Sequence, residues 1–311
     1  MIPLVVIVGP TAVGKSRLAL EIAARFQGEI VSADSRQVYR FMDIGTAKPS
    51  QEEQARVPHH LIDVVDPDQA FTVACYRDLA TRAIADISRR GKLPLLVGGT
   101  GLYVRTMTEG LSIPAVPPNP DFRRIMEARA AEEGANVLHR ELAAFDAQAA
   151  ANIDPRNVRR VIRALEVLHV VGKPISAFGR QDASAYRILF IGLTMERSAL
   201  YQRIDERVDR MMETGFLEEV QGLAAQGYRW DMPSMSGLGY QQLGEHLRGE
   251  TDLASAVQKA KYKTHRFARQ QYTWFRLQDP RIVWLDAQLD WNSVRELALS
   301  KTSTFLIDNR N

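Results

Sequence analysis

Gly9-Pro-Thr-Ala-Val-Gly14-Lys15-Ser16 is the stretch that decides the fold of this chain. It matches the phosphate-loop pattern G-x-x-x-x-G-K-[ST] and directly follows the apolar run 2–8. After it, residues 17–26 carry apolar side chains at helical spacing, so a strand, a glycine turn and a helix are expected in that order. Backbone N–H groups and the helix N-terminus would face an anion, Lys15 would add charge, and Ser16 could ligate Mg²⁺. The residues expected to hold a phosphate group are Gly9, Pro10, Thr11, Ala12, Val13, Gly14, Lys15 and Ser16.

Length and composition place the chain among ordinary globular proteins. It has 311 residues, of which 45% are hydrophobic and 25% charged, with a formal net charge of +3. One large domain or two modest ones are therefore expected. The sequence has neither an apolar run as long as a membrane span nor a start that resembles a signal peptide, so no membrane association is expected. Nothing in the pattern indicates an obligate dimer, and we expect a monomer.

The single cysteine, Cys75, excludes an intramolecular disulfide. This cysteine usage fits a reducing compartment, so a cytoplasmic location is expected. Because Cys75 lies in the apolar run 73–76, we expect a buried packing thiol and not a nucleophile.

Strand-like and helix-like segments alternate along most of the chain. This alternation predicts an α/β fold, in which a parallel, doubly wound sheet carries the phosphate loop and is flanked by helices. The expected strands span 2–8, 29–34, 93–97 and 186–193, with 282–286 as a candidate edge strand, and the main helices span 71–90, 197–215, 217–226 and 252–277.

A proline cluster separates this alternation from a purely helical pattern. Four prolines fall between residues 114 and 120, which is typical of a domain boundary or hinge. Residues 121–171 are rich in Ala, Glu and Arg and show no strand pattern. We therefore expect a catalytic core made of 1–115 and 186–311, with its C-terminal helices, and an all-helical insertion domain at 116–185.

Three segments are expected to end strands of the sheet: the phosphate loop, Asp34-Ser35 and Gly98-Gly-Thr-Gly101. Ligands bind at the carboxyl ends of parallel strands, so these segments should meet at one crevice. Asp34 could be a catalytic or Mg²⁺-binding carboxylate there, or it could cap the next turn together with Ser35. Thr100 and its neighbouring glycines could approach a ligand closely or form a plain tight turn.

His59, His60 and Asp63 contain the residue types of a metal site. Adjacent histidines point in different directions, however, and no distant third ligand is evident. A structural loop is therefore the favoured interpretation.

Two basic segments have a charge pattern that suits nucleic acid. Arg156, Arg159, Arg160 and Arg163 recur at i, i+3, i+4 and i+7, which places them on one helix face. Residues 259–276 combine six Lys or Arg residues with five aromatic residues and contain no acidic residue. The alternatives are a solvated helix face for the first segment and a helix that packs its aromatic rings on the core for the second.

The ordered series of motifs resembles that of the tRNA dimethylallyltransferases, also called tRNA isopentenyltransferases. The resemblance extends over almost the whole chain and includes the Pro-Thr-Ala of the phosphate loop. One departure is Gln270, where the family usually has a second basic residue beside Arg269, and it bears on one contact to the tRNA backbone. The matching blocks are Gly9 to Ser16, Asp34-Ser-Arg-Gln-Val-Tyr39, Met42-Asp-Ile-Gly-Thr-Ala-Lys-Pro49, Pro58-His-His-Leu-Ile-Asp63, Val97-Gly-Gly-Thr-Gly-Leu-Tyr103, Arg163-Ala-Leu-Glu-Val167, Gly237-Leu-Gly-Tyr240 and Gln271-Tyr-Thr-Trp-Phe-Arg276.

This resemblance implies a reaction. A dimethylallyl group would pass from its diphosphate to N6 of the adenosine at position 37 of tRNA, beside the anticodon, and diphosphate would be released. The phosphate loop would hold the diphosphate, with Mg²⁺ on Ser16 as cofactor, and Asp34 would be the base, with Thr100 beside it. Thr11, Ser35, Gln37 and Thr100 would orient the adenine and the prenyl donor. The residues expected to bind tRNA are Asp34, Ser35, Arg36, Gln37, Thr100, Arg123, Arg159, Arg160 and Arg163.

Three other functions use similar parts. Small-molecule kinases bind ATP on the same loop, although the sequence shows no obvious second Mg²⁺ aspartate unless Asp34 or Asp66 has that role. The arginine face of the insertion would also have no purpose in such a kinase. An isopentenyltransferase acting on free AMP, ADP or ATP would share the chemistry, but the C-terminal basic stretch and the insertion favour tRNA as the acceptor. An RNA-binding NTPase switch would need loops that sense the γ-phosphate, and the sequence shows none that we can identify.

Overall fold

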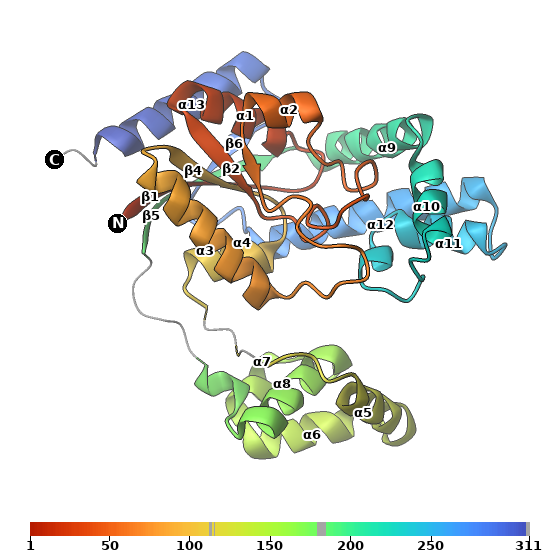
Figure 1. Cartoon of the computed structure of the whole chain (residues 1–311). Helices are drawn as coiled ribbons and strands as arrows, with labels where there is room; N and C mark the ends of the chain where they lie inside the picture. The colour runs from red at the N-terminus through yellow and green to blue at the C-terminus, as the bar shows by residue number, and fades with distance from the viewer. Residues whose placement is uncertain (112–113, 115, 179–184, 309–311) are drawn as a thin grey trace. The chain divides into compact units, whose positions relative to one another are not determined.

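The computed structural model describes residues 1–111, 114, 116–178 and 185–308. The chain divides into two compact units, one formed by Met1–Thr108 with Ser184–Asn311 and the other by Glu109–Ala183 (Figure 1). The insertion expected at 116–185 begins slightly later than the observed second unit and ends close to the same point.

Six parallel strands form the sheet of the larger unit, in the order β3-β2-β4-β1-β5-β6. Strand β1 lies inside the sheet between β4 and β5, with Val6 opposite Leu96 on one side and Phe190 on the other. Buried apolar side chains dominate β1 and β4, and every residue of β2 is buried, as a sheet covered on both faces requires. The parallel α/β fold is thus confirmed, including the edge strand at 282–286. The strands are β1 (Ile2–Val8), β2 (Gly28–Ser32), β3 (His59–His60), β4 (Leu93–Val97), β5 (Tyr186–Thr194) and β6 (Ile282–Asp286).

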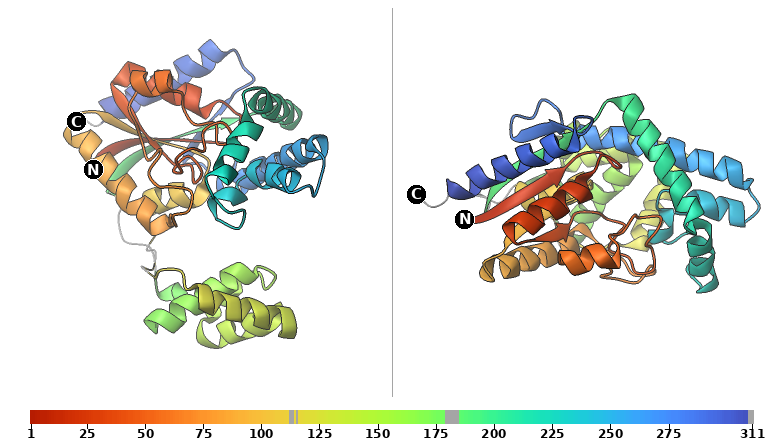
Figure 2. Two further views of the ribbon diagram at one scale, coloured as in Figure 1. Left: turned by 45° about the vertical axis from the view of Figure 1, so that its right-hand side comes forward. Right: turned by 90° about the horizontal axis from the view of Figure 1, so that it is seen from above.

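Helices cover both faces of this sheet. One face packs against α1 (Lys15–Phe26), α9 (Arg197–Glu213) and α13 (Trp291–Ile307), and the other against α3 (Val73–Arg89) and α4 (Gly101–Thr108). Figure 2 shows the same layers from two further directions. The two faces form separate apolar cores, and together they hold the carboxyl ends of β1, β2 and β4 in fixed register.

A third apolar core lies beside the sheet. It joins α10 (Phe216–Ala225), α11 (Tyr240–Leu247) and the start of α12 (Leu253–Trp274) to the segment 38–44. Val38, Tyr39 and Met42 are buried in it, so this polar, glycine-punctuated stretch has a defined conformation without regular secondary structure. The short helix α2 (Gln51–Arg56) follows this segment, and Ser50 and Glu53 begin it with a capping box.

The smaller unit is helical throughout the part that the structure describes. It contains α5 (Pro120–Glu133), α6 (Ala135–Phe145), α7 (Ala147–Asn152) and α8 (Val158–Val171), followed by the 3-10 turn η1 (Ile175–Ala177). Leu138, Leu142, Val161 and Leu165 are at the centre of its own core. Asn119 caps the start of helix α5, and Pro120 lies in its first turn.

Cys75 corrects one expectation, because its side chain is exposed and not buried. Thr72 caps α3, and the helical period from Val73 turns Tyr76 and Ala80 toward the sheet, which leaves Cys75 on the outer side. Within the described residues, no helix combines the length and the apolar character needed to cross a membrane.

Candidate active site

The three segments expected to meet at one crevice do meet in the larger unit. A cavity of about 750 Å³ is lined by the phosphate loop, by Asp34 and Ser35 after β2, and by Gly98 to Thr100 after β4. Because β2, β4 and β1 are neighbours in the sheet, their carboxyl ends present these loops side by side. The cavity therefore joins a phosphate-type loop, a carboxylate and a threonine hydroxyl.

Two glycines are required by the shape of the phosphate loop. Gly9 has φ 137°, and a Cβ at this position would lie 2.3 Å from the carbonyl oxygen of Leu193. Gly14 has a left-handed backbone, with φ 108°, at the start of α1. The loop can therefore pass close to β5 and turn sharply into the helix, as the motif predicts.

Lys15 brings an unusual cation to this cavity. Its Nζ donates a hydrogen bond to the carbonyl oxygen of Pro10 at 2.7 Å. Burial and, to a smaller extent, the positive charge of Arg207 lower the pKa of Lys15 to about 7, although the Asp34 carboxylate opposes the shift. An anion bound at the loop would restore the charged form of the lysine.

Gln271 of α12 connects two of the three cavity loops. Its side-chain oxygen accepts from the Thr11 N–H at 2.8 Å, and its side-chain nitrogen donates to the Gly99 carbonyl at 3.1 Å. A Cβ on Gly99 would lie 2.0 Å from that nitrogen, so a side chain at this position would displace the Gln271 amide. The sequence analysis did not identify Gln271 as a site residue, although a glutamine inside an amphipathic helix is a signal that could have found it.

Asp34 both caps a turn and lines the cavity. One carboxylate oxygen accepts from the Arg36 N–H at 2.8 Å, and no described residue bonds the other. Thr100 accepts from the Ser35 N–H at 3.1 Å and thereby ties the turn after β2 to the turn after β4. The two alternatives left open for Asp34 are therefore compatible.

The side chains of Arg36 and Gln37 line the cavity and also bond to the protein itself. Arg36 donates to the Pro233 carbonyl at 2.6 Å and to the Ser236 hydroxyl at 3.3 Å. Gln37 accepts from the Ser32 hydroxyl at 3.0 Å and donates to the Ala47 carbonyl at 3.2 Å. These contacts give both residues a role in shaping the cavity wall.

Three arginines of α9 were missed by the sequence analysis. Arg203, Arg207 and Arg210 all line the cavity, because a spacing of four and then three residues keeps them on one helix face. Burial lowers the pKa of Arg207, while the nearby Asp34 carboxylate raises it. Their spacing in the sequence was the available signal.

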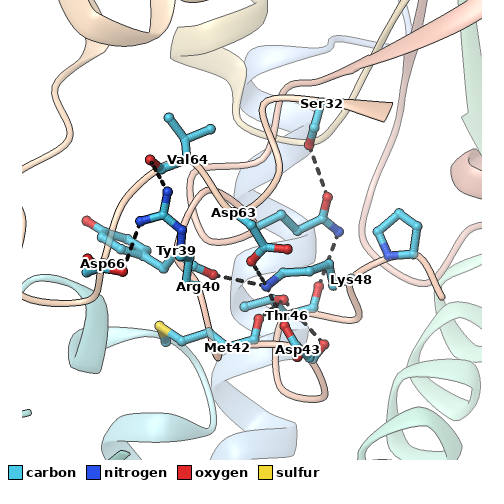
Figure 3. Close-up of polar contacts among 12 residues, drawn as sticks. Ser32, Tyr39, Arg40, Met42, Asp43, Thr46, Lys48, Asp63, Val64 and Asp66 are labelled. Carbon is cyan, nitrogen blue, oxygen red and sulfur yellow. Dashed lines mark hydrogen bonds and ion pairs between the residues drawn. The ribbon is translucent and has the colours of Figure 1, made fainter. Parts of the chain in front are cut away.

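Lys48 fixes the loop that forms another wall. Its side chain is 4% exposed and bonds to the Tyr39 carbonyl at 3.0 Å and to the carboxylates of Asp43 and Asp63 (Figure 3). Thr46 and Ala47 of this loop line the cavity. The buried lysine thus connects its own loop to Asp63, which lies in a later segment of the chain.

Comparison with known proteins decides the family. The model of the family described as "IPP transferase" matches residues 37–278, which is more than half of the chain. This chain belongs to the IPP transferase family. It is 56% identical to a protein of Roseiflexus castenholzii named tRNA dimethylallyltransferase, over 92% of this chain and 94% of that one. Its identity to a Chloroflexus aurantiacus protein of the same name is 52%, over 94% and 98%.

Solved structures of IPP transferases agree with the fold. The full-length tRNA isopentenylpyrophosphate transferase of Bacillus halodurans is 41% identical, with a TM-score of 0.74 and full coverage of both chains. A eukaryotic dimethylallyltransferase described as acting on tRNA is 28% identical, with a TM-score of 0.85 over all of this chain and 81% of its own.

The basic face of the insertion in this IPP transferase divides into paired and unpaired residues. Arg123 makes two hydrogen bonds, at 2.9 and 2.8 Å, to Glu166, whose side chain is 0% exposed, and Arg163 bonds the same carboxylate. Burial alone would raise the pKa of Glu166, but these arginines and the Asn119 N–H lower it to about 2. Arg159 and Arg160 are exposed, and no partner for either guanidinium group is found in the described part of the chain.

The second basic segment of this family member forms most of α12, and its residues divide in the same way. Tyr272, Trp274 and Phe275 pack against the core, as the structural alternative predicted. Tyr262 is 63% exposed, and Phe267 is exposed and also lines the cavity. Only the outward residues of α12 therefore remain available to a polyanion.

The histidine pair has protein partners. His59 Nδ1 lies 2.7 Å from the Val57 carbonyl oxygen, and His60 Nε2 lies 2.8 Å from a Glu29 carboxylate oxygen. No group of three or more His, Cys, Asp or Glu side chains with metal-binding geometry occurs within the described ranges.

Proposed function

We propose that this protein transfers a dimethylallyl group from dimethylallyl diphosphate to N6 of adenosine 37 of tRNA and releases diphosphate. The observation that carries the proposal is the single cavity that joins the phosphate loop to the Asp34 and Thr100 turns. Family membership supports it, because relatives more than 50% identical are named tRNA dimethylallyltransferases.

The diphosphate occupies the phosphate-loop side of the cavity. Backbone N–H groups at the start of α1 face it, and Lys15 and Arg207 supply positive charge as the allylic C–O bond breaks. The loop suits Mg²⁺, since the exposed Ser16 hydroxyl can join diphosphate oxygens and water as ligands. When bound, Mg²⁺ would neutralise charge on the departing diphosphate.

Asp34 is the proposed base. The N6 amine is a weak nucleophile because its lone pair is delocalised into the ring, so it must lose a proton as it attacks C1 of the donor. The new N–C bond forms while the C–O bond breaks, the proton passes to Asp34, and the electron pair leaves with the diphosphate. The Arg36 N–H and the Thr100–Ser35 contact hold this turn in place, and Ser35 and Thr100 are positioned to orient the adenine.

The adenine must leave its stack to enter a cavity at a sheet edge, so the base is flipped out of the anticodon loop. Arg159 and Arg160 are the insertion residues most available to tRNA phosphates, whereas Arg123 and Arg163 support them through Glu166. We further propose that the enzyme works in the cytoplasm as a monomer.

A labelling experiment tests this function. The protein is incubated with labelled dimethylallyl diphosphate or with γ-labelled ATP, in the presence of tRNA, AMP, ADP or ATP as acceptor. We expect label only in tRNA, only from the prenyl donor, and only when Mg²⁺ is present. Label transferred from ATP would indicate a kinase, and prenyl transfer to AMP but not to tRNA would indicate a free-nucleotide enzyme.

A further inference from the structure

The Glu219 carboxylate fills a small anion-binding nest in the loop after Met42. One of its oxygens accepts from the N–H groups of Asp43 at 2.8 Å and Ile44 at 2.7 Å. The other accepts from the Gly45 N–H at 3.1 Å and from the Tyr240 hydroxyl at 2.5 Å. Three successive backbone donors aimed at one anion form a nest, and here a side chain from α10 is the anion.

This loop needs contacts from outside to hold its shape. Phe41 and Ala47 flank it with φ values of 65° and 47°, a left-handed conformation that costs free energy in residues with a Cβ. A Cβ on Gly45 would lie 2.2 Å from the Phe216 ring, so the loop is also pressed against α10. Glu219 supplies four bonds to this region from a single side chain.

The loop formed by residues 43–47 is connected to the proposed base, Asp34. Thr46 and Ala47 line the cavity, and the Ala47 carbonyl accepts from Gln37, which lies three residues after Asp34. Gln37 in turn accepts from Ser32 at the end of β2. A shift of residues 43–47 would therefore reach the Asp34 turn, while the phosphate loop is held separately by Gln271.

We propose that Glu219 is a positioning residue of the transfer reaction, which fixes the acceptor side of the cavity by binding the backbone of residues 43–45. The proposal rests on the proposed function. It predicts that loss of the carboxylate impairs the chemical step and leaves donor binding nearly unchanged.

Glu219→Gln tests the proposal, because the amide is of equal size but directs an NH₂ group toward two donors. Glu218→Gln is the matched control, since Glu218 is exposed on the same helix and no bond to its side chain is found among the described residues. We expect Glu219→Gln to lower kcat at saturating tRNA by about 10- to 100-fold. The KM for dimethylallyl diphosphate should stay within about twofold of the wild-type value, because the substitution affects a step that follows donor binding.

Hydrogen exchange provides a second measurement that does not depend on activity. Amides of residues 43–45 should exchange about 10- to 100-fold faster in Glu219→Gln, because hydrogen bonds to a charged group are lost. Amides of β1 and β4 should be unchanged. Faster exchange throughout β1 and β4 would indicate general destabilisation and overturn the proposal.

Kinetics that match those of Glu218→Gln would also overturn it, as would a donor KM that rises as much as kcat falls. If the wild-type protein transfers no prenyl group to tRNA, the proposed function is contradicted. The two failures can be told apart, because hydrogen exchange at residues 43–45 still shows whether Glu219 holds this loop.

Discussion

The Gln271 side-chain oxygen accepts a hydrogen bond from the Thr11 N–H at 2.8 Å, although 260 positions separate the two residues. The same amide group donates to the Gly99 carbonyl at 3.1 Å. A helix near the end of the chain therefore sets the spacing between the phosphate loop and the turn that carries Thr100.

Gln271→Ala should loosen the phosphate loop and raise the KM for dimethylallyl diphosphate by about 10-fold, which corresponds to the free energy of one buried hydrogen bond. Gln258→Ala is the control, because Gln258 is an exposed residue of the same helix. Steady-state kinetics with the donor varied would measure the difference. Equal KM values in the two variants would contradict the role of this bridge.

Lys15 should make donor binding depend on pH. Its pKa is lowered to about 7 in the unliganded cavity, so the lysine is mainly neutral at pH 8. A bound diphosphate favours the protonated form, and binding must then take up a proton. We expect calorimetry in buffers of different ionisation enthalpy to report uptake approaching one proton at pH 8, and Lys15→Met to abolish it. Uptake that persists in Lys15→Met would assign the proton to another group.

Asp34→Asn separates the capping role of Asp34 from its proposed role as base. The asparagine oxygen can still accept from the Arg36 N–H, but the amide cannot take a proton from N6. Turnover should fall by about 10²- to 10⁴-fold while tRNA affinity changes little. Single-turnover rates and filter binding measure the two quantities. A variant that binds tRNA poorly but reaches the normal rate at saturation would exclude the base role.

Arg160→Ala should weaken tRNA binding and make it less sensitive to salt. Loss of one phosphate contact lowers the slope of log affinity against log salt by about 0.7 to 0.9. Arg295→Ala on α13 is a control outside the insertion, where the arginine is paired with Glu296. An unchanged slope in Arg160→Ala would remove this residue from the interface.

Arg163→Ala should lower the free energy of unfolding more than Arg160→Ala does. Glu166 would lose one of its charged partners while remaining buried, which costs about 1–3 kcal/mol. The exposed pair of Arg124 with Asp121 provides the control, since Arg124→Ala should cost less than about 1 kcal/mol. Denaturant unfolding of the three variants measures this, and equal stabilities for Arg163→Ala and Arg124→Ala would contradict the structural role of Glu166.

Much of the fold could be predicted because its signals are local. The apolar runs at Ile2–Val8 and Leu93–Val97 and the glycine loop between strand and helix each follow from short-range periodicity. The helical insertion could be predicted from the composition of residues 121–171 and from the prolines that precede them. The exposure of Cys75 was mispredicted because the four-residue apolar run that contains it does not show which side of α3 faces the sheet.

The missed parts of the candidate site depend on contacts between distant segments. Gln271 and Glu219 bond to backbone groups that lie far away in the sequence, and Lys48 bonds to Asp63 in another segment. A polar residue in an amphipathic helix can be noticed in the sequence, but its distant partner cannot be identified there. The sequence did not show that Arg163 of the arginine face is paired, because the burial of Glu166 between Arg123 and Arg163 depends on the packing of α5 on α8. Sequence patterns locate charges, whereas folding decides which charges remain unpaired.

The strand order β2-β4-β1 also sets the separation between the strands that carry Asp34 and the phosphate loop. Asp34 follows the first of these strands and the phosphate loop follows the third, so two interstrand spacings of about 4.8 Å separate the strands that carry them. In the proposed reaction this interval must accommodate only the amine, C1 and the bridging oxygen. Because lengthening the prenyl chain alters none of these atoms, discrimination between donors of different chain length falls to the side chains of the cavity wall and not to the spacing of the strands.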